Sequence, residues 1–74
     1  MNEKLRSLAL VAGDECEQHW RLAECYAHFC QVLIEADLAA ISREELEEFV
    51  LVAFERRQER FPKVPLLNRA GVYA

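Results

Sequence analysis

Residues 42–62 read SREELEEFVLVAFERRQERFP, and this stretch carries the most specific structural signal in the chain. Ser42 and Glu45 form a capping box, in which each side chain accepts a hydrogen bond from the other residue's backbone N–H at the start of a helix. Glutamates fill the first turns and arginines the last, and both interact favourably with the helix dipole. Pro62 cannot continue the helix. The stretch therefore predicts a helix over residues 43–60.

A second helix is predicted over residues 15–36, upstream of this stretch. Its apolar residues fall on two adjacent stripes, one containing Tyr26 and Phe29 and the other containing Trp20 and Ile34. Together the stripes are wider than contact with a single helix requires. Because residues 37–41 form a short connection, we predict that the second and third helices pair antiparallel as a helical hairpin.

The first helix is predicted over residues 3–12, with Asn2 as its N-cap. Gly13 interrupts the apolar pattern, and Asp14 with Glu17 makes a variant of the capping box. The chain therefore either begins a new helix at Asp14 or continues with a local bend. A new start is favoured, because glycine is acceptable at a helix end and costly inside a helix.

The remaining residues, 61–74, lack helical periodicity, and the spacing of Pro62 and Pro65 favours an extended start. We predict an extended C-terminal tail that packs partly on the helices. The 74 residues are 53% hydrophobic and include only two glycines and two prolines. This composition excludes a two-domain enzyme, a disordered chain and a turn-rich β-sandwich. The fold prediction is a single all-α domain of three helices spanning residues 1–74.

The apolar surface is larger than three helices easily bury. Phe49 to Phe54 are six apolar residues in a row, so Leu51 and Val52 would face water on a solitary helix. Small domains often gain stability from a partner subunit. We therefore predict a homodimer, with a four-helix core as one arrangement.

Cysteine and histidine recur at a spacing typical of metal ligands, in the pairs Cys16/His19 and Cys25/His28. If residues 15–36 form one continuous helix, however, the two cysteines lie on opposite sides of it. We therefore predict no metal site and no cofactor, with the thiols acting as small buried side chains. A metal or redox sensor built from these residues remains an alternative function.

The compartment is predicted from the same cysteines. Three cysteines, including Cys30, cannot close into a complete set of internal disulfides. The apolar run from Leu8 to Ala12 is too short for a secretory signal, and no segment approaches the length of a membrane span. We expect a cytoplasmic protein with reduced thiols.

Catalysis finds little support in the sequence. Cys25 with His28 has the residue types of a thiol nucleophile and its base, and Glu44 with Glu48 those of an acid and base pair. Both need a cleft that a short helical chain with two glycines is poorly equipped to build. We predict that the protein is not an enzyme.

Charge is distributed unevenly along the chain. Residues 1–55 carry four basic and twelve acidic side chains, whereas residues 56–74 carry five basic and one acidic. A basic end can contact nucleic acid, although most DNA-binding modules have a pI above about 9 and this chain has one near 5.1. A nucleic-acid-associated transcriptional modulator is thus an alternative function, with contacts from Arg56, Arg57, Arg60 and Lys63.

Protein binding is the leading prediction. Trp20 has polar neighbours in the sequence and is either a core edge or an interface anchor. The acidic side chains would steer a partner electrostatically. We predict a small regulator or inhibitor that binds another protein, of a kind that phages and mobile elements often encode. Its predicted contact residues are Trp20, Glu44, Glu45, Glu47, Glu48, Leu51 and Val52.

The third predicted helix resembles part of the haemolysin-expression-modulating family of small bacterial helical regulators. The shared residues are Ser42, Glu45, Leu46 and Phe49, followed by Ala53 and Arg56. The resemblance covers one helix of the chain. It implies a regulator that acts through another protein.

Overall fold

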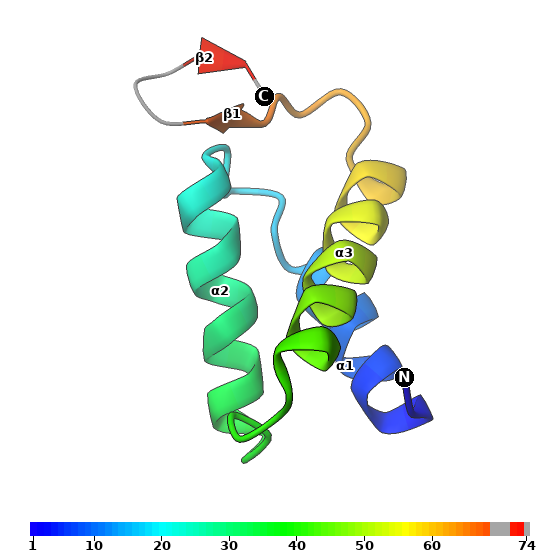
Figure 1. Cartoon of the computed structure of the whole chain (residues 1–74). Helices are drawn as coiled ribbons and strands as arrows, with labels where there is room; N and C mark the ends of the chain where they lie inside the picture. Colours follow the sequence, from blue (N-terminus) through cyan, green and yellow to red (C-terminus); the bar gives the residue numbers. More distant parts are fainter. Residues whose placement is uncertain (69–71, 74) are drawn as a thin grey trace.

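The computed structural model describes residues 1–68, 72 and 73, and the surroundings of side chains up to residue 66. Three helices and one short strand pair follow one another along the chain (Figure 1). They are α1 (Glu3–Asp14), α2 (Leu22–Glu35), α3 (Arg43–Arg60), β1 (Leu67–Asn68) and β2 (Val72–Tyr73). The predicted small all-α domain with three helices is confirmed.

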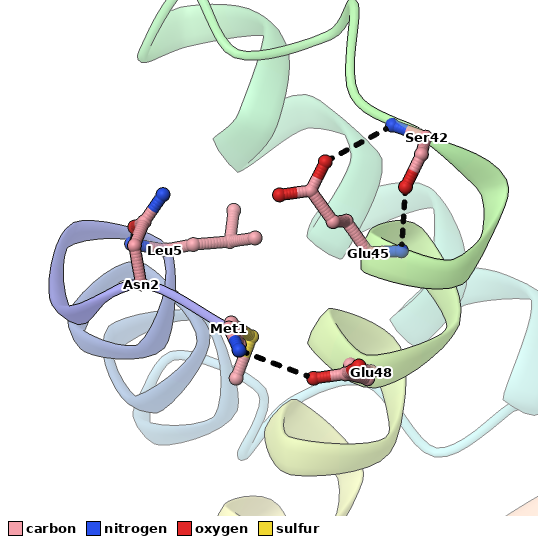
Figure 2. A network of polar contacts seen from close by, with 6 residues as sticks. All are labelled: Met1, Asn2, Leu5, Ser42, Glu45 and Glu48. Carbon is pink, nitrogen blue, oxygen red and sulfur yellow. Dashed lines mark hydrogen bonds and ion pairs between the residues drawn. The ribbon is translucent and has the colours of Figure 1, made fainter.

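The helix α3 begins and ends where the sequence predicts. Both capping-box hydrogen bonds are present: the Glu45 N–H donates to Ser42 Oγ at 3.1 Å, and the Ser42 N–H donates to Glu45 Oε1 at 3.3 Å. Asn2 caps α1, its Oδ1 accepting from the Leu5 N–H at 2.8 Å. Figure 2 shows the two helix starts side by side, with the Met1 ammonium 3.7 Å from Glu48 Oε2.

The prediction for the junction between the first two helices is wrong. Helix α1 continues through Gly13 to Asp14, and α2 begins only at Leu22, so residues 15–21 are not helical. Asp14 does not start a new helix: it is the last residue of α1, and its carboxylate accepts from Arg56 Nε at 2.7 Å. Helix α2 has Arg21 at its N-cap and no side-chain cap there.

Gly13 lies inside α1 because α3 passes directly against it. A Cβ atom at this position would lie 2.5 Å from the Ala53 carbonyl oxygen and 2.7 Å from Arg56 Cβ. No side chain fits into that gap. The contact is completed by two further small buried residues of α1, Ala9 and Ala12.

Helix α2 runs antiparallel to α3, as predicted (Figure 1). Its backbone nevertheless lies much farther from α3 than that of α1 does. Side chains bridge the difference: the buried Phe29 meets Phe54 edge to face, with ring centroids 4.8 Å apart. That α1 is the closest neighbour of α3 was not predicted.

Helix α2 ends at a Schellman motif, in which Asp37 has a φ of 59°. The Leu38 N–H donates to the Leu33 carbonyl and the Asp37 N–H to the Ile34 carbonyl, at 2.9 and 3.0 Å. These bonds satisfy carbonyls that the helix end leaves free. The chain thereby reverses into α3.

The C-terminal tail is non-helical wherever the structure describes it. Leu66 packs against the core, and β1 pairs antiparallel with β2, Leu67 opposite Tyr73 and Asn68 opposite Val72. The strand pair lies beyond the first turn of α2 (Figure 1). Residues 69–71 and 74 of the predicted tail lie outside the described residues. No helix in the described part of the chain is both long and apolar enough to cross a membrane.

Candidate functional site

An apolar groove separates α2 from α3. It encloses about 430 Å³ and is lined by Tyr26 of α2 together with Leu46, Val50, Leu51 and Phe54 of α3. Arg43 and Glu47 form its polar rim. The groove exists because α2 reaches α3 only through long side chains, whereas α3 lies close to α1.

The groove continues toward the turn between the two helices. A second cavity of about 180 Å³ is lined by Cys30, Leu33, Ile34, Ala39, Ile41 and Leu46. Leu46 lines both cavities, so they adjoin. Leu51 is 61% exposed, Ile34 57% and Tyr26 43%. We call the two adjoining cavities, with all the residues that line them, the α2–α3 groove.

The predicted contact residues Leu51 and Val52 belong to different surfaces. Leu51 lines the α2–α3 groove. Val52 is half-buried, packs against the core and lines a more polar depression with Arg6 and Leu10 of α1. Their adjacency in sequence therefore does not make them one interface.

Trp20 lies apart from the groove, in the connection before α2. Its side chain is 55% exposed. It lines a shallow depression with Gln18, Arg21 and Glu24. Trp20 is therefore available as a second, separate contact point.

The four glutamates of the predicted steering surface have different surroundings. Glu45 is half-buried and its carboxylate is engaged in the capping box. Glu47 accepts from Arg43 Nε at 3.2 Å, and Glu48 faces the Met1 ammonium. Glu44, Glu47 and Glu48 are exposed, but only Glu47 lines the groove.

The four basic residues predicted to contact nucleic acid do not form one free patch. Arg57 is wholly buried. Arg56 and Arg60 both point to Asp14, with Nε to Oδ1 distances of 2.7 and 3.6 Å. The hydrogen bond from Arg56 lowers the pKa of Asp14, and both guanidinium charges add to this effect. Lys63 is exposed.

The predicted separation of Cys16 from Cys25 is also wrong. Because residues 15–21 are not helical, Cys16 need not lie opposite Cys25: both thiols are buried in the same core, and each shifts the pKa of the other. The His19 and His28 rings also lie close together, with centroids 5.4 Å apart. Within the described residues, no three Cys, His, Asp or Glu side chains form a group that could hold a metal ion.

Arg57 is the residue of this region that the sequence interpretation missed. It lies four residues after Ala53 and eight after Phe49, and all three are buried on α3. This spacing places them on one face of a helix. The signal was therefore present, but arginine is almost never fully buried unless its charge is paired.

No family model, curated protein or solved structure matches the chain. The resemblance of α3 to the haemolysin-expression-modulating family is therefore confined to the residues quoted for it.

Proposed function

We propose that this protein is a non-enzymatic regulator, and that its α2–α3 groove binds an amphipathic helix of a partner protein. The observation that carries the proposal is the groove itself, an apolar depression that continues into a second cavity and leaves Tyr26, Ile34 and Leu51 in water. Amphipathic helices commonly dock their apolar face into such grooves.

The length of α2 limits the length of a partner helix that could lie along the groove. Helix α2 has 14 residues, which corresponds to a length of about 21 Å. A partner helix of similar length would present side chains at steps of three and four residues to both cavities. Leu46, which lines both cavities, would lie near the middle of this contact.

Charge favours a basic partner helix. Residues 1–55, which include α2 and most of α3, carry twelve acidic side chains against four basic ones. Glu47 lies on the groove rim, and Glu44 is exposed on the first turn of α3. Basic residues on the polar face of the partner would raise the rate of association.

Two designed amphipathic helical peptides test the proposal. They share one apolar face and differ only in carrying lysine or glutamate on the polar face. We expect the lysine peptide to bind more tightly in calorimetric titrations, and to shift the NMR signals of Tyr26 and Leu51. Leu51→Glu should abolish binding. Val11→Glu is the matched control, because Val11 is exposed on α1 and lines none of the groove cavities.

Equal binding by both variants, or no binding of the lysine peptide, would contradict the proposed docking site. Sedimentation at micromolar concentration then tests the predicted homodimer. A dimer that Leu51→Glu dissociates and Val11→Glu leaves intact would show that a second copy of the chain occupies the groove in place of a partner helix.

Nucleic-acid binding is the weaker proposal, because Asp14 already pairs with two of the basic side chains and a third is buried. Titration with duplex DNA at several salt concentrations separates the two functions. Micromolar affinity that falls steeply with salt would favour DNA binding over protein binding.

A further inference from the structure

A buried cluster of two thiols and a guanidinium lies where residues 15–21 meet α2 and α3. Cys16, Cys25 and Arg57 have no exposed surface. The His19 carbonyl oxygen accepts from Arg57 Nη2 at 3.1 Å and from Cys25 Sγ at 3.4 Å. The Cys25 sulfur and the guanidinium therefore both contact the same carbonyl oxygen.

The guanidinium charge has little compensation from other groups. Arg57 Nη2 also donates to the Pro65 carbonyl at 3.1 Å, while Nε and Nη1 are buried without a hydrogen-bond partner. Both observed acceptors are neutral carbonyls, and the described ion pairs do not include Arg57. A buried charge without a counter-charge is costly. A thiolate at Cys25 would supply the missing negative charge.

The surroundings of the two sulfurs favour ionisation of one of them. A hydrogen bond from the Cys16 thiol lowers the pKa of Cys25, and the Arg57 charge lowers it further, against the opposing effect of burial. The same sulfur contact and burial raise the pKa of Cys16. The protonated Cys25 thiol donates to the His19 carbonyl, and an ionised Cys25 would be stabilised by the nearby Arg57 charge.

We propose that Cys16 and Cys25 form a redox-active dithiol, which hydrogen peroxide oxidises to an intramolecular disulfide. The Cys25 thiolate attacks one peroxide oxygen, the O–O bond breaks, and hydroxide leaves as Cys25 becomes a sulfenic acid. The Cys16 sulfur then attacks the Cys25 sulfur, forming the S–S bond and releasing the sulfenic oxygen. With proton transfer, two thiols and one peroxide give one disulfide and two waters.

Exposure and activation predict different reactive residues. Cys30 is half-exposed in the α2–α3 groove, whereas Cys16 and Cys25 are buried. Peroxide is close to water in size, and local opening of residues 15–21 would admit it. If exposure alone controlled reactivity, Cys30 would react first.

Peroxide treatment followed by mass spectrometry tests the proposal. At neutral pH, one equivalent of peroxide should remove two hydrogen atoms from the intact mass, and peptide mapping should locate a bond between Cys16 and Cys25. Cys30 should remain alkylatable. Oxidation of Cys30 first, or oxygen addition without a bond between the other two, would overturn the proposal.

Single substitutions assign the roles of the two thiols. In Cys16→Ser, peroxide should leave a sulfenic acid at Cys25 that dimedone traps, because no resolving thiol remains. Cys25→Ser should leave Cys16 unreactive. Cys30→Ser is the matched control and should form the disulfide at the rate of the unchanged protein. Equal dimedone labelling of Cys16 and Cys25 in the two serine variants would refute the assigned order.

Arg57 is a positioning and activating residue in this scheme. Arg57→Met should slow oxidation of Cys25 at pH 7 by about tenfold, whereas Arg57→Lys should retain most of the rate. If Arg57→Met does not fold, the pH dependence of Cys25 alkylation in the unchanged protein replaces it. A midpoint below the ordinary thiol pKa of about 8.5 is expected, and a midpoint at or above that value would overturn the proposal.

Discussion

The two sides of α3 are packed in opposite ways. Toward α1, small residues allow the backbones to approach until no atom fits between Gly13 and the Ala53 carbonyl. Toward α2, the contact depends on the Phe29 and Phe54 rings, which meet edge to face. A helix drawn closely to one neighbour leaves a wider space toward the other. The α2–α3 groove is therefore a consequence of the close α1–α3 contact.

The largest expected effect comes from removing the side chain that attaches α2. Phe29 has no exposed surface, and Phe→Ala changes in a core cost about 3–5 kcal/mol. A domain of this size rarely has more stability than that. We therefore expect Phe29→Ala to be unfolded at 25 °C by circular dichroism. A folded variant would show that α2 is held mainly by other contacts.

Gly13→Ala tests the close contact between α1 and α3. In an ordinary helix interior this change stabilises by about 1 kcal/mol. Here the added Cβ would meet the Ala53 carbonyl and the Arg56 side chain, so we expect a loss of about 2 kcal/mol. Urea unfolding measures the sign. A gain in stability would mean that α1 and α3 separate easily, and the explanation of the groove would then fail.

Leu51→Glu and Val52→Glu distinguish the two sides of α3 directly. Val52 packs against the core, so its substitution should lower the free energy of unfolding by about 1–3 kcal/mol. Leu51 is 61% exposed, and its substitution should change stability by less than about 0.5 kcal/mol. Thermal unfolding of dilute samples compares them. Equal losses would place Leu51 in a buried contact.

The smallest effect is expected from Asp14→Asn, which removes the ion pairs beside the α1–α3 contact. Because native pairing lowers the pKa of Asp14, its contribution is present above the unfolded value of about 3.9 and disappears as pH falls through the lower native value. The unchanged protein should therefore melt above the variant at pH 7, and the difference should shrink in acid. A difference that persists at low pH would have another cause.

Local signals in the sequence were sufficient for α3. Its start is set by Ser42 and Glu45, which are three residues apart, and the structure confirms both bonds. The end of α1 could not be predicted in this way. The Asp14 partner, Arg56, lies 42 residues away in the sequence. The low helix propensity of glycine suggested that the helix would end at Gly13. That propensity does not take into account that α3 lies too close to this position for a Cβ atom.

Of the two candidate sites, the sequence predicted the apolar groove in part and did not predict the thiol cluster. The apolar excess on the second and third helices and the exposure of Leu51 were both readable from periodicity. The thiol cluster was not predicted, because residues 15–36 were expected to form one continuous helix with Cys16 and Cys25 on opposite sides. Because residues 15–21 are not helical, Cys16 can lie near Cys25. Only the three-dimensional path of the chain shows this.

The burial of Arg57 has a consequence for protein engineering. Replacing a buried charged group and its surroundings with well-packed apolar residues is often neutral or stabilising. A redesigned chain with apolar residues at positions 16, 25 and 57 should therefore tolerate more heat than the natural one while losing its response to peroxide. Such a trade-off between thermal stability and chemical reactivity is common where a functional site destabilises the protein. Directed evolution for thermostability alone would then be expected to erase this cluster early.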